Sequence, residues 1–206
     1  MSYLMDSSQE DALSEFGNIG AAHAATSLSQ MLASPIEMTV PEVQAVDIAE
    51  MYNYIGSEVS AMVVFQIQGE VEDGGYIVVS MPKETVIRLT NQMLGTTDID
   101  REIDEMDRSA AIEIGNIMIS AFLDATAELL GIVMLPSPPA LAIDMAHAAF
   151  ASIVAQMVGD VNDVLIFNTE LTSEAPPIYG SIYMLPNPEL MQQLSLMLQR
   201  LMEPLV

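Results

Sequence analysis

Hydrophobic and polar positions along the chain follow one order of elements, and that order occurs twice. Two long stretches, residues 9–33 and 101–131, are rich in Ala, Leu, Ile and Met, with apolar residues at helical spacing. Strand-like segments come next in each half, and the half ends with a helix that opens on proline, which is tolerated at the first helical position. The pattern predicts two repeats, over about residues 1–98 and 99–206.

Shorter elements fill the rest of each repeat. In the first repeat, Gly95 ends the closing helix, and the residues Asp73, Gly74 and Gly75 predict the turn of a hairpin. In the second repeat, prolines interrupt the first strand. The predicted strands are 36–46, 57–68, 76–81, 132–143, 161–171 and 178–185, and the predicted shorter helices are 47–55, 82–94, 145–158 and 188–202.

The join between the repeats, residues 95–100, is short and acidic and has no Gly, Ser or Pro-rich linker. We therefore expect residues 1–206 to form a single domain of the α+β class with pseudo-two-fold symmetry. Hairpins from both repeats should share one continuous, mostly antiparallel sheet, and the two long helices should cover it.

Five pairs of residues recur 98 positions apart, which identifies the halves as a tandem duplication. On a helix, positions 11, 15 and 18 fall within about 60° of one another, and so do positions 109, 113 and 116. Each long helix therefore presents one polar stripe. The pairs are Asp11 and Ser109, Glu15 and Glu113, Gly17 and Gly115, Asn18 and Asn116, and Pro41 and Pro139.

The Glu and Asn of each stripe suit the positioning of a partner rather than the binding of a metal, because no histidine lies at ligand spacing. A carboxylate binds a cation, and a carboxamide both donates to and accepts from a water molecule. A solvated helix face is the simpler explanation of one such pair, but two copies in the same register favour a functional role. Each Asn follows a glycine, which costs about 1 kcal/mol inside a helix and indicates close packing or close approach of a partner.

Charge is the next feature that changes the picture. The 206 residues include 29 acids and 5 bases, a net charge of -24 that excludes a nucleic-acid binder driven by phosphate neutralisation. A disordered acidic tail is excluded too, because 51% of the residues are hydrophobic. An acidic surface can attract a basic partner or adapt a protein to molar salt. The acids are dispersed along the chain, which favours salt adaptation, as in a halophilic archaeon.

Other residue types point away from several functions. The chain has no cysteine, no secretory signal pattern and no apolar run of about 18 residues, so we expect a cytoplasmic protein without membrane insertion. We expect His23 and His147 to be partly buried and hydrogen-bonded, not metal ligands. The acidic run 98–107 fits a helix N-terminus better than a calcium loop. A sugar hydrolase using Glu15 and Glu113 is disfavoured, because the chain has no Trp and few aromatic residues.

The two complete motifs resemble the paired signature of the CheC phosphatases of bacterial and archaeal chemotaxis. The resemblance covers essentially the whole chain, and its mild departure is Asp11, where the signature has Ser. The resemblance implies a hydrolase that removes the phosphoryl group from an aspartate of phosphorylated CheY. It also implies that Mg²⁺ sits in CheY, that this chain has no cofactor of its own, and that CheD is a second partner.

The resemblance also implies roles for the motif residues. Glu15 or Glu113 would pair with the conserved lysine of CheY, and Asn18 or Asn116 would align a water for in-line attack. A non-catalytic adaptor of the chemotaxis or flagellar-switch system, binding CheY or CheD, is the alternative. The supporting residues have structural roles: Asp11 and Ser109 cap or buttress the stripe, Gly17 and Gly115 are its helix glycines, and Pro41 and Pro139 shape the start of the following strand.

Overall fold

A seven-stranded sheet, with strands from both repeats, forms the middle layer of the molecule. The computed structural model describes residues 7–70, 74–155, 163–172 and 178–202. The strands are β1 (Glu37–Asp47), β2 (Val59–Gly69), β3 (Gly75–Pro82), β4 (Met134–Pro136), β5 (Ala140–Met145), β6 (Asp163–Thr172) and β7 (Ile178–Pro186). The helices are α1 (Ser7–Leu32), the 3₁₀ helix η1 (Ile48–Asn53), α2 (Lys83–Leu94), α3 (Glu105–Leu130), α4 (Ala146–Val154) and α5 (Pro188–Met202).

The strand order β1-β6-β7-β3-β2, with β4 and β5 both paired to β2, interleaves the repeats. Every pairing is antiparallel. The first strand of each repeat pairs with the second strand of the other, and the third strands β3 and β7 pair at the centre, where Val78 lies opposite Tyr183. The predicted pseudo-two-fold α+β fold with one mostly antiparallel sheet is confirmed.

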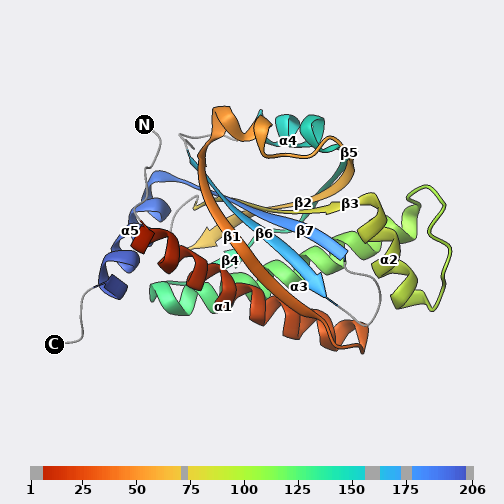
Figure 1. Ribbon diagram of the computed structural model, residues 1–206, viewed down its shortest axis with the longest axis horizontal. Coiled ribbons are helices and arrows are strands. Elements are labelled where there is room, and N and C mark those ends of the chain that lie inside the picture. Colours follow the sequence, from red (N-terminus) through yellow and green to blue (C-terminus); the bar gives the residue numbers. More distant parts are fainter. Residues whose placement is uncertain (1–6, 71–73, 156–162, 173–177, 203–206) are drawn as a thin grey trace.

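Helices cover both faces of the sheet. The long helices α1 and α3 lie side by side on one face and run in opposite directions, while α4 and η1 lie on the other face (Figure 1). Because side chains alternate along a strand, Val63 and Val79 belong to the core beneath α1 and α3, whereas Met62 and Val78 belong to the core beneath α4 and η1. The sheet therefore fixes the two motif-bearing helices as neighbours.

Three phenylalanines join the motif helices to the sheet. The ring of Phe16 in α1 meets that of Phe122 in α3 edge to face, with centroids 6.1 Å apart. Phe167 in β6 packs against both rings, at 6.1 and 5.6 Å. All three side chains are buried, so they hold α1 and α3 in one relative position.

Most predicted elements occur within a few residues of their expected bounds. Helix α3 begins at Glu105, four residues later than expected, because Asp104 caps it through the amides of Met106 and Asp107. The predicted helix 47–55 is a 3₁₀ helix. Asp73 of the predicted turn and residues 156–158 of the predicted helix 145–158 lie outside the described residues.

Helix α3 is long and apolar, although the sequence has no uninterrupted apolar run of the length of a membrane span. By length and hydropathy it is the one helix among the described residues that could cross a membrane. More than half of its most apolar stretch is buried against the sheet and α1, which is the pattern of a core helix.

Candidate functional site

The two Glu/Asn pairs lie on the outer sides of the two long helices. Glu15 and Asn18 are exposed on α1, and on α3 Glu113 is exposed and Asn116 half-buried. The apolar residues of each helix face the sheet, since Leu13 and Phe16 of α1 are buried between the polar positions. Amphipathic spacing therefore places each carboxylate and carboxamide one turn apart at the surface.

The helix packing separates the two pairs into two sites. Phe16, which is next to Glu15 in α1, meets Phe122 in α3. Phe122 lies 9 residues beyond Glu113, a distance of about 13 Å along a helix that rises 1.5 Å per residue. A single group of a partner therefore cannot contact both carboxylates, so the two motifs are spatially separate; that each of them is a functional site stays a prediction.

The glycines of the motifs lie on the buried sides of their helices. Gly17 and Gly115 are buried, whereas the Asn residues that follow them are not. A Cβ atom on Gly115 would lie 2.9 Å from Cβ of Val63 in β2, too close for an ordinary contact. Gly115 therefore lets α3 lie close to the sheet, so the close neighbour at this glycine is a strand of the protein itself.

Asp11 and Ser109 occupy the fifth position of their helices, and both are exposed. The Ser109 hydroxyl donates to the carbonyl of Glu105, 3.0 Å away and one turn earlier. Asp104, not Ser109, caps α3. Ser109 therefore does not cap the helix, and its hydrogen bond is with the first turn of its own helix; that Asp11 and Ser109 buttress the stripe stays a prediction.

The paired prolines mark breaks in equivalent strands. Pro41 lies within β1, where the pairing with β6 shifts register between Thr39 and Glu42. Pro139 lies between β4 and β5, directly before β5 begins. Proline lacks the amide donor of a ladder, so both positions suit an irregularity. We expected each proline to shape the start of the strand after its helix. Pro41 instead lies inside β1, and Pro139 follows β4 and precedes β5, so neither lies at the start of the first strand after its helix.

A buried ion pair fixes the start of the second motif helix. The Asp107 carboxylate is fully buried and accepts from the Arg101 guanidinium, at 2.9 Å in one of the two contacts, and from the backbone amide of Asp104 at 2.9 Å. Burial alone would raise the pKa of Asp107, but the hydrogen bonds from Arg101 and Asp104 and the charge of Arg101 lower it to about 2. Asp107 in turn raises the pKa of Arg101.

The same arginine ties α3 to the end of α2. Arg101 donates to Oδ1 of Asn91 at 3.3 Å, and Asn91 donates to the carbonyl of Asp98 at 2.8 Å. Asn91 is buried. We call Asn91, Arg101 and Asp107 the clip. It holds the last turn of α2 beside the first turn of α3. Asp104 caps α3, and Glu105 and Asp107 lie in its first turn, so the prediction that the acidic run 98–107 marks a helix N-terminus is confirmed.

A hollow lies between these two turns, directly beside the second motif. Its volume is about 290 Å³, and it includes both Ser109 and Glu113. The other lining residues are Thr90, Met93, Leu94, Met106 and Ala110. Sequence reasoning missed this hollow, because it is formed by side chains that the clip brings together from two helices.

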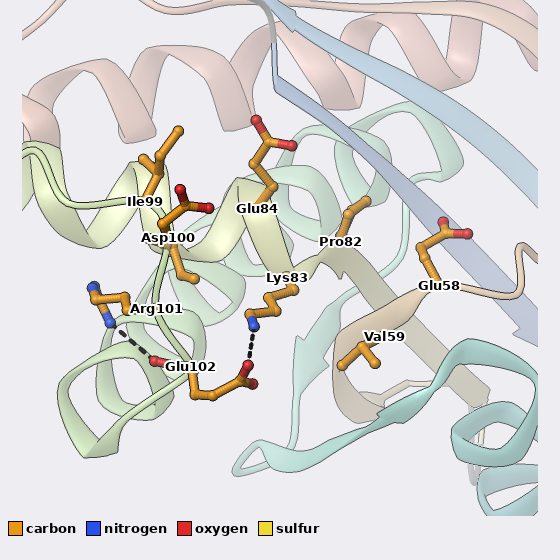
Figure 2. A pocket seen from close by; sticks show the side chains of 10 residues that line it. Glu58, Val59, Pro82, Lys83, Glu84, Ile99, Asp100, Arg101 and Glu102 are labelled. Atoms are coloured by element: carbon orange, nitrogen blue, oxygen red, sulfur yellow. Dashed lines mark hydrogen bonds and ion pairs between the residues drawn. The ribbon is translucent and has the colours of Figure 1, made fainter.

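A larger hollow of about 910 Å³ lies at the start of α2, and Figure 2 shows its side chains. Lys83 pairs across it with Glu102 at 2.8 Å, and Arg101 is held by Asp107. Both bases in its lining therefore have carboxylate partners already. No motif residue is among its lining residues, so this hollow is separate from the Glu/Asn sites.

Neither histidine forms a metal site with its described neighbours. His23 is exposed, so the expectation that it is partly buried is wrong. His147 is half-buried and stacks on Tyr52, with ring centroids 4.2 Å apart. Its Nε2 atom is buried without a hydrogen bond to any described residue, so the expectation of a fully hydrogen-bonded ring is wrong as well. Over residues 7–70, 74–155, 163–172 and 178–202, no three His, Asp or Glu side chains gather as metal ligands.

Comparison with known proteins agrees with the two motifs. The model of the CheC-like family matches residues 9–44 and 106–143, the segments that contain both motifs with their prolines. A Bacillus subtilis protein named CheY-P phosphatase CheC is 27% identical over 186 residues, which cover 87% of this chain and 88% of that protein. A candidate CheY-P phosphatase, CheC1 of Halobacterium salinarum, is 25% identical over 192 residues, or 92% of this chain and 95% of that protein.

A solved structure shares the fold. The crystal structure of Thermotoga maritima FliY superimposes with a TM-score of 0.77 and 25% sequence identity, covering 96% of this chain and 98% of that one. The resemblance to CheC-like proteins predicted from the motifs is confirmed.

Proposed function

We propose that this chain, which resembles the CheC-like family in both of its repeats, hydrolyses the aspartyl phosphate of phosphorylated CheY. The observation that carries the proposal is the pair of equivalent surface sites, each with a Glu and an Asn one helical turn apart. The relative named CheY-P phosphatase CheC supports the choice of substrate. We extend the proposal to a cytoplasmic location and, on the resemblance alone, to CheD as a second partner.

In this mechanism the chain contributes positioning. The carboxylate of Glu15 or Glu113 binds the lysine of the receiver and orients the docked partner. The carboxamide of Asn18 or Asn116 enters the receiver site and aligns a water molecule. The water oxygen attacks phosphorus as the bond from phosphorus to the aspartate oxygen breaks, which gives a free carboxylate and inorganic phosphate. Asparagine is no base at neutral pH, so its contribution is orientation, and the protons of the water leave with the phosphate.

The charge of the phosphoryl group is stabilised within the partner. A Mg²⁺ ion in the CheY site is part of the proposal, as is the receiver lysine, and this chain supplies no cofactor. Phosphoryl transfer depends mainly on alignment and charge stabilisation, so two side chains on a rigid helix are sufficient for acceleration.

A dephosphorylation time course tests the proposal. CheY from the same genome is phosphorylated, and the decay of its acyl phosphate is followed in molar KCl with and without the parent chain. We expect Asn18→Ala and Asn116→Ala each to retain part of the acceleration and the double variant to lose it. Asn53→Ala, at an exposed asparagine on η1 across the sheet, is the matched control and should retain full activity.

Two results would contradict the mechanism. Undiminished acceleration by the double variant would show that the carboxamides do not align the water. Binding of phosphorylated CheY without any acceleration by the parent chain would instead favour the non-catalytic adaptor.

A further inference from the structure

Three large apolar side chains are exposed around the hollow beside Glu113. Met93 and Leu94 at the end of α2 and Met106 at the start of α3 are 41%, 49% and 54% exposed. We call these three residues the apolar rim. We propose that the apolar rim is the surface on which the second site docks the receiver domain of its phosphorylated partner. This inference rests on the proposed function and adds the contacts that set the affinity of one of its two sites.

The first argument is continuity with the site. Glu113 and Ser109 of the second motif line the same hollow as the three rim residues. A partner whose cation reaches the Glu113 carboxylate therefore covers the apolar rim as it docks. Burial of exposed apolar surface stabilises such a contact, and two or three central side chains supply much of the binding energy of a typical interface.

The second argument is charge. Glu113 is the one charged residue in the lining of the hollow, and it forms no ion pair with another described residue. A partner that presents a cation surrounded by apolar side chains matches this arrangement. A second copy of the chain, docked hollow to hollow, would place two carboxylates together without a cation. The arrangement therefore favours a receiver domain over self-association.

The third argument is rigidity. The clip joins α2 to α3 through the buried Asp107 and Asn91, so the rim residues on the two helices keep a fixed spacing. A surface that is already ordered loses less conformational entropy when a partner binds. Apolar contacts also persist at high ionic strength, where the attraction between Glu113 and a lysine is screened.

The two repeats differ at one of the three rim positions. Met106 corresponds, 98 positions earlier, to Ser8 in the first repeat. The first site therefore has a polar residue type at this position of its motif helix. Because all three rim residues line the hollow beside Glu113, we expect their substitution to act on the second site alone.

The experiment isolates the second site by removing the first motif with Glu15→Ala and Asn18→Ala. In this background the double rim variant Leu94→Asn with Met106→Gln is compared with a matched control, Leu135→Asn with Met145→Gln, whose residues are 51% and 45% exposed and line neither hollow. We expect the rim variant to raise KM for phosphorylated CheY by about tenfold with kcat unchanged, and the control to change neither.

A second background and a second readout complete the test. With Glu113→Ala and Asn116→Ala, only the first site operates, and the rim variant should leave KM unchanged. CheY loaded with beryllofluoride and Mg²⁺ measures binding without hydrolysis, and its Kd in the first background should rise by the same factor of about ten. Met93→Gln, expected to give about a threefold change, replaces the double variant if circular dichroism shows that variant unfolded.

The outcomes separate the inference from the proposed function. An unchanged KM and Kd in the first background, or an equal rise in the second background, would overturn the inference while phosphatase activity stands. A rim-dependent Kd in a chain that never accelerates hydrolysis would support the inference and refute the phosphatase. Concentration-dependent self-association that the rim variant abolishes would assign the surface to a second copy instead.

Discussion

Gly20 of α1 lies against the ring of Phe122 of α3, so that a Cβ atom on Gly20 would come within 2.9 Å of Cγ and closer still to two other ring carbons. Because Gly20 has no side chain, the backbone of α1 can lie directly against this ring. The repeat counterpart of Gly20 is Met118, so the duplication did not keep glycine here. A larger residue at position 20 would therefore force α1 and the Phe122 ring apart.

We predict that Gly20→Ala destabilises the protein although alanine is the better helix former. The new methyl group would overlap a buried ring that cannot move without disturbing Phe16 and Phe167. Overpacking of this kind costs about 1–3 kcal/mol. Replacing glycine by alanine in a helix gains about 1 kcal/mol, so we expect a net loss of stability. Denaturant unfolding in molar KCl measures the change.

Gly56→Ala is the control for Gly20→Ala. The three atoms nearest to its Cβ would all belong to the carboxylate of Glu58, an exposed side chain that is free to turn away. We expect little change in the free energy of unfolding for Gly56→Ala. Equal stability of the parent and Gly20→Ala would mean that the helices separate readily at this contact.

The clip predicts a pH dependence at Asp107. Its pKa of about 2 in the folded chain is below the ordinary 3.8, so the folded state binds fewer protons between these values. The stability contributed by Asp107 is therefore present above about pH 4 and is lost as the pH falls towards 2. Asp107→Asn removes this contribution and leaves Arg101 without its buried partner, at a cost of about 3 kcal/mol at neutral pH.

Unfolding titrations at several pH values check the Asp107 prediction. The difference in unfolding free energy between the parent and Asp107→Asn should be largest at neutral pH and should shrink between pH 4 and pH 2. Asp124→Asn, at an exposed position of α3, should match the parent throughout. A difference that stays constant down to pH 2 would show that the carboxylate charge does not matter.

The exchange of strands between repeats predicts that neither half folds alone. β1 of the first repeat pairs with β6 of the second, and β2 pairs with β4 and β5. Residues 1–98 expressed alone would expose these strand edges and the apolar face of α1. We expect no cooperative unfolding transition for 1–98 or for 99–206, and recovery of the native circular dichroism spectrum when both are co-expressed. A cooperative transition of either half alone would contradict the single-domain expectation.

The acidic composition predicts a requirement for salt. The chain has 29 acids and 5 bases. Among the described residues, the ion pairs involve few of these acids: Glu84, Glu102, Asp104, Glu105 and Asp107. Repulsion among the other carboxylates favours unfolding in dilute buffer and is screened in molar KCl. Circular dichroism should show loss of native structure in dilute buffer and its return with KCl. Full native structure without salt would refute the adaptation.

Periodicity predicted the fold well because each element carries its own signal. The apolar spacing of α1 and α3, Gly95 at the end of α2 and the duplicated Glu and Asn positions are all local patterns. Contacts between elements have no such pattern. The hollow beside Glu113 and the burial of Asp107 depend on where α2 ends relative to α3, and the exposure of His23 depends on how α1 is rotated. The sequence did hold a sign of the close contact at Gly20, because a glycine inside a helix aligns there with the much larger Met118 of the other repeat.

The role assigned to the carboxamides gives the most direct test of chemistry at the second site. In the Glu15→Ala, Asn18→Ala background, Asn116→Asp keeps the size of the side chain but replaces its amide donor with a carboxylate. The carboxylate would repel the phosphoryl group and could accept from the water but not donate to it. We therefore expect Asn116→Asp to lose acceleration at least as completely as Asn116→Ala, by tenfold or more, following the order of magnitude of positioning effects.

Asn53→Asp is the control for Asn116→Asp, because it adds the same charge at an exposed asparagine of η1, which lies on the opposite face of the sheet. Its rate should equal that of the background, so a loss specific to Asn116 cannot come from net charge. Hydrolysis is followed as release of inorganic phosphate from CheY. If Asn116→Asp were faster than Asn116→Ala, the side chain would be acting as an acceptor or base for the water, and the orienting role of the amide donor would be wrong.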